Sequence, residues 1–347
     1  MTQASSNKHN APSQQENGAP THRRSVTVDV SLPWPTTSFF GRKQEMAQLD
    51  QMLKNSNCRL ITLLGPGGIG KTRLALQAAM EHQSDYADGV ALVSLVNLAN
   101  IDEIASAVLS TLDPRPAPVH ESQDQWAVQM RARHMLLVLD NFEHLAGDAK
   151  LLTQLMYLAP NVQMIVTSRT RLHLQHEWVF EVDGLDALPA GEIGGITSPH
   201  SSAVELFVQR ARQARSTLDI GGTADLAYIV RICQAVRCMP LAIELAASWV
   251  RVLSVQEILQ EIERNVTVLA TVAPDVALRH RSIDAVFEHS WRLLSPEEQR
   301  LFARLSIFRG SFTRDAAGKV VTTYLSLSFD GDLKQACGTL TGATRIK

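Results

Sequence analysis

Residues 59–80 decide the fold and read Arg59-Leu-Ile-Thr-Leu-Leu, Gly65-Pro66-Gly67-Gly68-Ile69-Gly70-Lys71-Thr72 and Arg73-Leu-Ala-Leu-Gln-Ala-Ala-Met80. An apolar run of strand length leads into the glycines, and a pattern typical of a helix leads out of them. Gly65, Gly70, Lys71 and Thr72 stand at the spacing G-x-x-x-x-G-K-[ST]. This stretch predicts a phosphate-binding loop between a buried strand and a helix.

Each part of the loop has a physical purpose. Glycines let consecutive backbone N–H groups turn toward an anion, and the helix that follows adds the positive end of its dipole. We expect Lys71 to reach the outer phosphates and Thr72 to place its hydroxyl on Mg²⁺, which takes few protein ligands. The alternative is a glycine-rich turn with no ligand. With glycine at about 7% of residues, the four fixed positions would coincide in only about one chain in a hundred of this length.

Composition sets limits on the rest of the chain. The 347 residues suggest two or three domains, and 45% hydrophobic with 20% charged residues are globular values. A net charge of −2 gives no overall attraction to nucleic acid or to an anionic membrane. The four cysteines show no C-x-x-C spacing, which argues against a zinc site or a disulfide framework. With no apolar run of membrane-spanning length and a polar N-terminus, we expect a cytoplasmic protein.

Strand-like and helix-like patterns alternate over the first half of the chain. Apolar runs predict strands near 59–64, 89–95, 135–140, 162–167 and 177–182, and helical patterns include 123–133 and 144–158. This alternation predicts the α/β fold of a P-loop NTPase, a parallel sheet wrapped by helices, over residues 33–190.

The flanking segments have other patterns. Residues 1–32 are predicted to be disordered, since their N-terminal part is rich in Ser, Asn, Gln and Pro, and 198–268 has a helical pattern broken at Pro240. A third unit begins near 278 and contains the capping-box sequence Ser295-Pro-Glu-Glu298. From 318 to 347 the pattern weakens into a tail with one alternating segment, 320–329.

Three side chains follow buried strands and could carry chemistry. Asp140 ends an apolar strand about 70 residues after Lys71, where an acid can hold the Mg²⁺ shell. Asn141 cannot act as a base, so Glu143 is the nearest carboxylate that could position a water. Arg169, in Thr167-Ser168-Arg169, follows the next strand at the same sheet edge and could bind a terminal phosphate. From physics alone, Arg169 could equally be a solvated arginine, and Pro240 a plain kink.

Together these motifs resemble the nucleotide-binding module of STAND ATPases of the NB-ARC type, in the bacterial version found in large transcriptional regulators and signalling proteins. The resemblance covers about residues 33–317. The motifs that carry it are Phe40-Gly41-Arg42 with Glu45, the loop Gly65 to Thr72, Leu136 to Leu145, Ile165 to Arg169, Met239 to Ala247, and Ser282 to Phe312 as the start of a winged-helix domain.

The resemblance implies an ADP-bound resting state and an ATP-bound active state that engages a protein partner or a second copy. It makes Thr72 and Asp140 the Mg²⁺ ligands and Arg169 the sensor of the terminal phosphate. The expected catalytic set is Lys71, Asp140, Glu143 and Arg169. The expected nucleotide-binding set is Phe40, Gly41, Arg42, Gly65, Pro66, Gly67, Gly68, Ile69, Gly70, Lys71, Thr72, Arg73 and Pro240.

Three features depart from the family pattern. Cys238 stands where the family has glycine before its Pro-Leu motif, no Met-His-Asp motif follows residue 280, and the tail does not resemble the rest of a winged helix. We therefore expect a partial winged-helix domain over 278–317, in a truncated or frameshifted version of the family.

The function that these patterns favour is a nucleotide-dependent switch, with ATP hydrolysis at most a slow timer. A P-loop kinase would need an arginine-rich lid that the sequence does not show. A DNA-binding regulator would act through the arginines between 279 and 314, which acidic residues dilute. A remnant that binds nucleotide without signalling is the fourth possibility.

Overall fold

The computed structural model of the chain describes residues 37–98, 100, 103–112, 129–186, 201–217, 223–264, 269–270, 282–308 and 312–325. The predicted disordered segment 1–32, most of the predicted helix 123–133 and the end of the tail lie outside these residues. Within them, no helix is long and apolar enough to cross a membrane.

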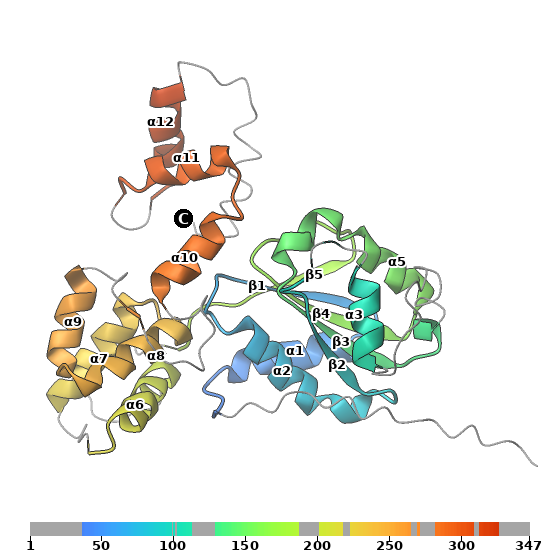
Figure 1. The fold of residues 1–347 in the computed structure, drawn as a ribbon, viewed down its shortest axis with the longest axis horizontal. Coiled ribbons are helices and arrows are strands. Elements are labelled where there is room, and N and C mark those ends of the chain that lie inside the picture. The colour runs from blue at the N-terminus through green and yellow to red at the C-terminus, as the bar shows by residue number, and fades with distance from the viewer. Residues whose placement is uncertain are drawn as a thin grey trace, which may run out of the picture.

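A five-stranded sheet with the strand order β2-β3-β4-β1-β5 forms the centre of the first domain (Figure 1). All of its pairings are parallel. The strands are β1 (Leu60–Leu64), β2 (Val90–Ser94), β3 (Met135–Asp140), β4 (Val162–Ser168) and β5 (Glu177–Glu181). The predicted α/β fold, a parallel sheet wrapped by helices, is confirmed.

Helices cover both faces of this sheet, which explains why its central strands are apolar without a break. Alternate residues of β3 contact opposite cores: Leu137 packs with α3 (Glu103–Leu112) and α5 (Lys150–Leu158), and Val138 packs with α1 (Lys43–Lys54) and α2 (Lys71–Glu81). A short 3₁₀ turn, η1 (Gln83–Asp85), follows α2.

The register of the sheet brings the ends of three strands together. Leu64 pairs with Ser168, and Ser94 pairs with Asp140. The loop after β1, the acid that ends β3 and the polar end of β4 therefore share the carboxyl edge of the sheet, where open α/β sheets bind ligands.

The predicted helix 144–158 is wrong in its first half. Residues Phe142–Asp148 form a 3₁₀ segment, η2, and α5 starts only at Lys150. Phe142 and Leu145 are both buried, and their separation of three residues matches the three-residue turn of a 3₁₀ helix.

A second unit consists of helices with a core of their own. These are α6 (Ser202–Ala214), α7 (Thr223–Ala235), α8 (Pro240–Ser248), the 3₁₀ turn η3 (Trp249–Arg251) and α9 (Val255–Arg264). Pro240 is the first residue of α8, where its missing N–H costs nothing because that group would have no partner in the helix. The predicted break at Pro240 is thus a boundary between two helices.

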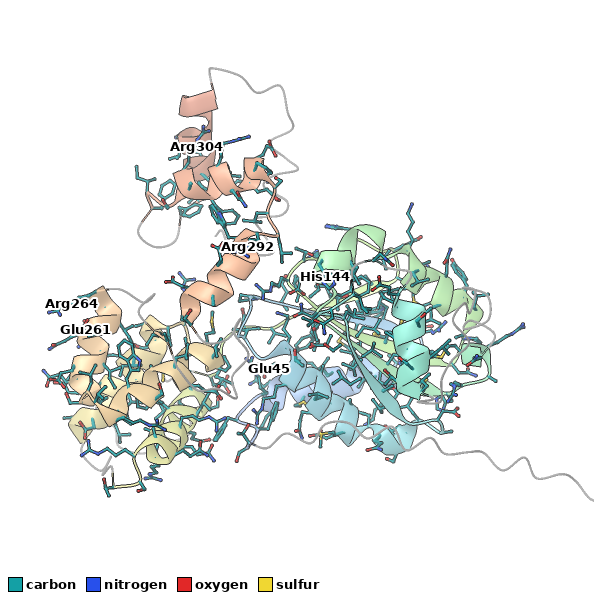
Figure 2. The ribbon with its side chains drawn as sticks, in the orientation of Figure 1. Glu45, His144, Glu261, Arg264, Arg292 and Arg304 are labelled. Atoms are coloured by element: carbon teal, nitrogen blue, oxygen red, sulfur yellow. The ribbon has the colours of Figure 1, made fainter. Side chains whose placement is uncertain are left out.

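The third group of helices lies apart from the sheet in Figure 1. It contains α10 (Ile283–Trp291), α11 (Pro296–Leu305) and α12 (Arg314–Leu325), and Ser295 with Glu298 forms the predicted capping box of α11. Its core is small, with Leu305 and Ala317 as the buried hydrophobic residues of the described part. Figure 2 labels Arg304 on α11 and Arg292 directly after the end of α10.

Helix α12 corrects the expectation of an alternating segment at 320–329, because residues up to Leu325 are helical and 326–329 lie outside the described residues. The Thr313 hydroxyl accepts a hydrogen bond from the N–H of Ala316 at 3.2 Å and so starts the helix, and Ala317 packs in the core beside Leu305. The cap at Thr313 and the packing of Ala317 therefore outweigh the local alternation of apolar and polar residues, and the segment forms a helix.

The first two units meet closely after β5. The N–H of Leu185 donates to the carbonyl of Cys238 at 2.9 Å, and a Cβ built on Gly184 would lie 2.3 Å from the carbonyl oxygen of Arg237. Arg237 and Cys238 have φ values of 51° and 52°, which glycine adopts more readily than other residues. Cys238 therefore takes up a backbone conformation that glycine would favour.

We expect Gly184→Ala to destabilise the protein by about 2 kcal/mol or more, because the new methyl group would meet backbone that cannot move aside cheaply. Gly147→Ala is the matched control, since a Cβ at that glycine meets nothing within 4 Å. Urea unfolding of both variants checks this. Equal free energies of unfolding for the two variants would show that the junction is not tightly packed.

Candidate functional site

The predicted phosphate loop lies between β1 and α2. Gly68 and Gly70 have φ values of 77° and 97°, and Gly70 is the N-cap of α2. These are left-handed conformations that favour glycine. The loop thus directs backbone N–H groups and the positive end of the α2 dipole toward the carboxyl edge of the sheet.

Lys71 is buried at the start of α2. Its ammonium group donates hydrogen bonds to the carbonyls of Gly65 at 2.7 Å and Pro66 at 3.0 Å. Burial lowers the pKa of Lys71 to about 8; the nearby Glu143 and Asp140 carboxylates act to raise it, and Arg169 acts to lower it further. The ammonium group thus has two acids and a second cation around it.

The two predicted Mg²⁺ ligands are in direct contact. Thr72 Oγ1 donates to Asp140 Oδ1 at 2.6 Å, and Thr167 Oγ1 donates to the same oxygen at 2.7 Å. Thr167 Oγ1 also accepts from the backbone N–H of Asn141 at 2.9 Å. Thr167 was missing from the predicted site. Its position near the end of β4, the strand next to β3, could have indicated that its hydroxyl reaches Asp140.

This donor set fits Mg²⁺. A hydroxyl and a carboxylate are hard oxygen ligands, and Mg²⁺ is usually held by one or two carboxylates together with water and phosphate oxygens. No cluster of three or more His, Cys, Asp or Glu side chains suited to a metal occurs among the described residues, so a cage made only of protein ligands is not found there.

Glu143 and Arg169 form a buried ion pair at the same edge. Arg169 Nε lies 2.9 Å from Glu143 Oε1, and the side chains are 10% and 2% exposed. The second carboxylate oxygen, Glu143 Oε2, is buried and has no hydrogen-bond partner among the described residues. Two side chains for which the sequence predicted separate roles are therefore joined.

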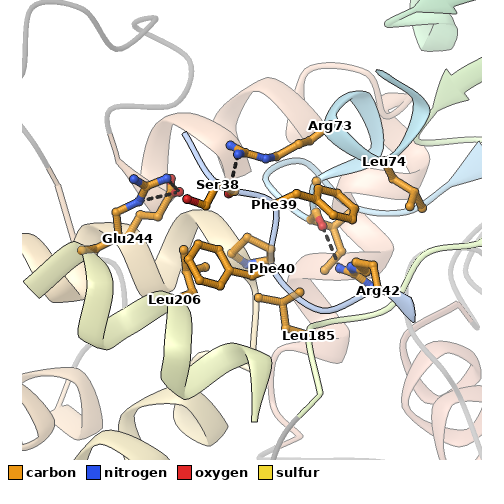
Figure 3. Close-up of a pocket in the computed structure, with 13 residues that line it drawn as sticks. Ser38, Phe39, Phe40, Arg42, Arg73, Leu74, Leu185, Leu206 and Glu244 are labelled. Carbon is orange, nitrogen blue, oxygen red and sulfur yellow. Dashed lines mark hydrogen bonds and ion pairs between the residues drawn. The ribbon is translucent and has the colours of Figure 1, made fainter. Parts of the chain in front are cut away.

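A cleft next to the phosphate loop lies between the first two units (Figure 3). It has about 400 Å³ of empty space, part of it open to solvent. Its walls are Ser38, Phe39, Phe40, Arg42, Ile69, Gly70, Arg73, Leu74, Leu185, Leu206, Arg210, Pro240 and Glu244. Aromatic and aliphatic side chains with a few polar groups are typical of sites for a flat ring such as a nucleobase.

The polar residues of this cleft hold its walls together. The Arg42 guanidinium donates to the carbonyls of Ile69 at 3.1 Å and Gly184 at 3.4 Å and pairs with Glu45 at 2.7 Å. Arg73 donates to the Thr37 hydroxyl at 2.6 Å and also to the carbonyl of that residue. Both arginines were predicted to bind nucleotide, and in this structure their donors bind protein.

Other predicted residues have packing roles. A Cβ on Gly41 would lie 2.4 Å from the Cβ of Ser202, so glycine lets the chain pass against α6. A Cβ on Gly65 would lie 2.9 Å from the carbonyl oxygen of Val182. Pro66 and Gly67 belong to the phosphate loop and are not among the walls of the cleft.

Helix α8 touches the phosphate loop directly. The N–H of Leu241 donates to the carbonyl of Gly68 at 3.2 Å, and a Cβ on Gly68 would meet the Leu241 side chain at 3.0 Å. Arg210 of α6 pairs with Glu244 of α8 at 2.8 Å, at the rim of the cleft. The first turns of α8 thus connect the loop to the helical unit.

Residues 53–174 match the family model described as an AAA domain, a P-loop ATPase module, which implies nucleotide binding. The chain is 33% identical to the uncharacterized protein Rv0894 of Mycobacterium tuberculosis over 297 residues, 85% of this chain and 72% of that protein. It is 32% identical over 255 residues to Rv0890c of the same organism, named as a candidate HTH-type transcriptional regulator, and this match covers 73% of the chain and 27% of that protein.

Among solved structures, the chain is similar to a Signal Transduction ATPase with Numerous Domains (STAND) protein with a tetratricopeptide repeat sensor from Pyrococcus horikoshii. The TM-score is 0.39 at 15% identity, over 90% of this chain and 40% of that one.

We expect Thr167→Val to weaken Mg²⁺-dependent ATP binding about tenfold, since a hydrogen bond to a charged group contributes about 1.5–3 kcal/mol. The methyl group keeps the shape of the side chain but neither donates to Asp140 nor accepts from Asn141. Thr167→Ser keeps the hydroxyl and is the matched control. Titration of ATP with and without Mg²⁺ checks this, and equal affinities of both variants with Mg²⁺ would contradict it.

Proposed function

Since the chain belongs to the same family as Rv0894 and carries an AAA domain, we propose that it is a nucleotide-dependent switch of the STAND type, in its NB-ARC form. ADP holds the resting state, and ATP with Mg²⁺ favours a state that binds a protein partner or a second copy. ATP hydrolysis acts as a slow timer.

The observation that carries this proposal is the contact between α8 and the phosphate loop. The hydrogen bond from Leu241 to Gly68 puts the second unit on the backbone that would surround the phosphates. A nucleotide that changes the conformation of the phosphate loop therefore also changes the hydrogen bond that holds α8 against the loop. To shift the population between two arrangements, the two nucleotides need differential affinities of a few kcal/mol.

Slow hydrolysis is proposed from the residues around Asp140. Asn141 carries no carboxylate, and Glu143, the nearest acid along the chain, is paired with Arg169. A general base must reach the attacking water, and one oxygen of this carboxylate is already bound to Arg169.

Direct DNA binding through residues 279–314 has less support. Arg292, just after α10, pairs at 2.9 Å with Glu288 of that helix, and Arg300 pairs at 2.9 Å with Glu297 of α11. These arginines are exposed and could still reach phosphates, but the neighbouring acids reduce the positive potential that attracts a duplex. A role in transcription is suggested by the name of Rv0890c, most of which lies outside the match.

The bound nucleotide tests the switch. The protein is purified gently and denatured, and the released nucleotide is identified by chromatography, with Lys71→Ala as the control. We expect about one ADP per chain in the wild type and less than about a tenth of that in the variant, since the lysine contributes a charge-assisted contact to phosphate. A protein that carries no nucleotide and fails to bind added ADP or ATP would overturn the proposal.

A further inference from the structure

The Glu143–Arg169 pair is placed where a terminal phosphate would compete for it. Arg169 follows β4 at the carboxyl edge of the sheet, and its charge and that of Glu143 both act on the Lys71 ammonium. A guanidinium forms the same paired hydrogen bonds with a carboxylate or a phosphate, so it can exchange one partner for the other.

The orphaned oxygen of Glu143 distinguishes this pair from an ordinary structural ion pair. A buried carboxylate normally has partners for both oxygens, because an unpaired buried oxygen is unfavourable. Here Oε1 is bound to Arg169 and Oε2 has no partner among the described residues. Arg169 is thus the cation in direct contact with the Glu143 carboxylate.

We propose that Glu143 is a specificity-determining residue that sets the relative affinity for nucleoside triphosphate and diphosphate. It holds Arg169 until a terminal phosphate binds the guanidinium. This inference rests on the proposed function, in which the phosphates bind at the loop before α2.

A nucleoside diphosphate and a nucleoside triphosphate have different effects on the Glu143–Arg169 ion pair. A diphosphate leaves Arg169 on Glu143. A triphosphate draws the guanidinium toward its terminal phosphate and away from Glu143, which leaves a buried carboxylate without its cation. Glu143 therefore weakens triphosphate binding selectively and keeps the resting nucleotide competitive.

The test is Glu143→Gln, titrated with ADP and with a non-hydrolysable ATP analogue in the presence of Mg²⁺. We expect the analogue to bind about tenfold tighter than to the wild type and ADP to change by less than about twofold, since the amide holds the guanidinium less strongly. Glu143→Asp, with a shorter carboxylate, gives a smaller shift in the same direction and serves if the glutamine variant does not fold.

Two controls distinguish an effect of Glu143 through Arg169 from a general effect of removing an acidic side chain. In the Arg169→Ala background, Glu143→Gln should no longer change the ratio of the two affinities, because the cation that both compete for is gone. Glu263→Gln removes the acid of an exposed ion pair with Arg231, 2.6 Å long, and should change neither affinity.

The outcomes are distinct. If both nucleotides bind the wild type but their affinity ratio stays constant in Glu143→Gln, this inference is overturned and the switch proposal stands. The same holds if the variant only slows hydrolysis, since Glu143 would then act as a base. If neither nucleotide binds the wild type, the proposed function fails, and this inference fails with it.

Discussion

The hydrogen bond between Thr72 and Asp140 joins the parts on which the site depends. It connects the first turn of α2 to the end of β3 at 2.6 Å, and Thr167 adds the end of β4 to the same carboxylate oxygen. Three segments that are far apart in the sequence are thus fixed at one point by side chains. A parallel sheet makes this possible because all of its strands end at the same edge.

The phosphate loop has a second attachment, to the helical unit. The carbonyl of Gly68 binds the N–H of Leu241, and Arg42 binds both Ile69 of the loop and Gly184 of the junction. These contacts use backbone carbonyls, so they depend on the path of the loop more than on its side chains. A closely packed interface of this kind changes between discrete arrangements more readily than it deforms gradually.

The sequence predicted those parts of the site that local patterns determine. The spacing of Gly65 to Thr72 and the apolar run ending in Asp140 are local, and both led to the correct strands and loop. The ion pair of Glu143 was not predictable, since it depends on the 3₁₀ turn η2, where helical periodicity suggested an ordinary helix. The burial of Arg42 was not predictable from local patterns either, because its hydrogen-bond partners lie up to 142 residues away in the sequence.

The charges at the carboxyl edge follow from the same geometry. Lys71 and Arg169 supply two cations, and Asp140 and Glu143 supply two anions, with all four side chains largely buried. A balanced set can remain desolvated, whereas an excess of either sign would be costly in a medium of low dielectric constant. Phosphate and Mg²⁺ would enter such a site together, since each offsets the charge of the other. In the proposed switch, a third phosphate competes with Glu143 for Arg169, and this links the number of phosphates to the position of one arginine.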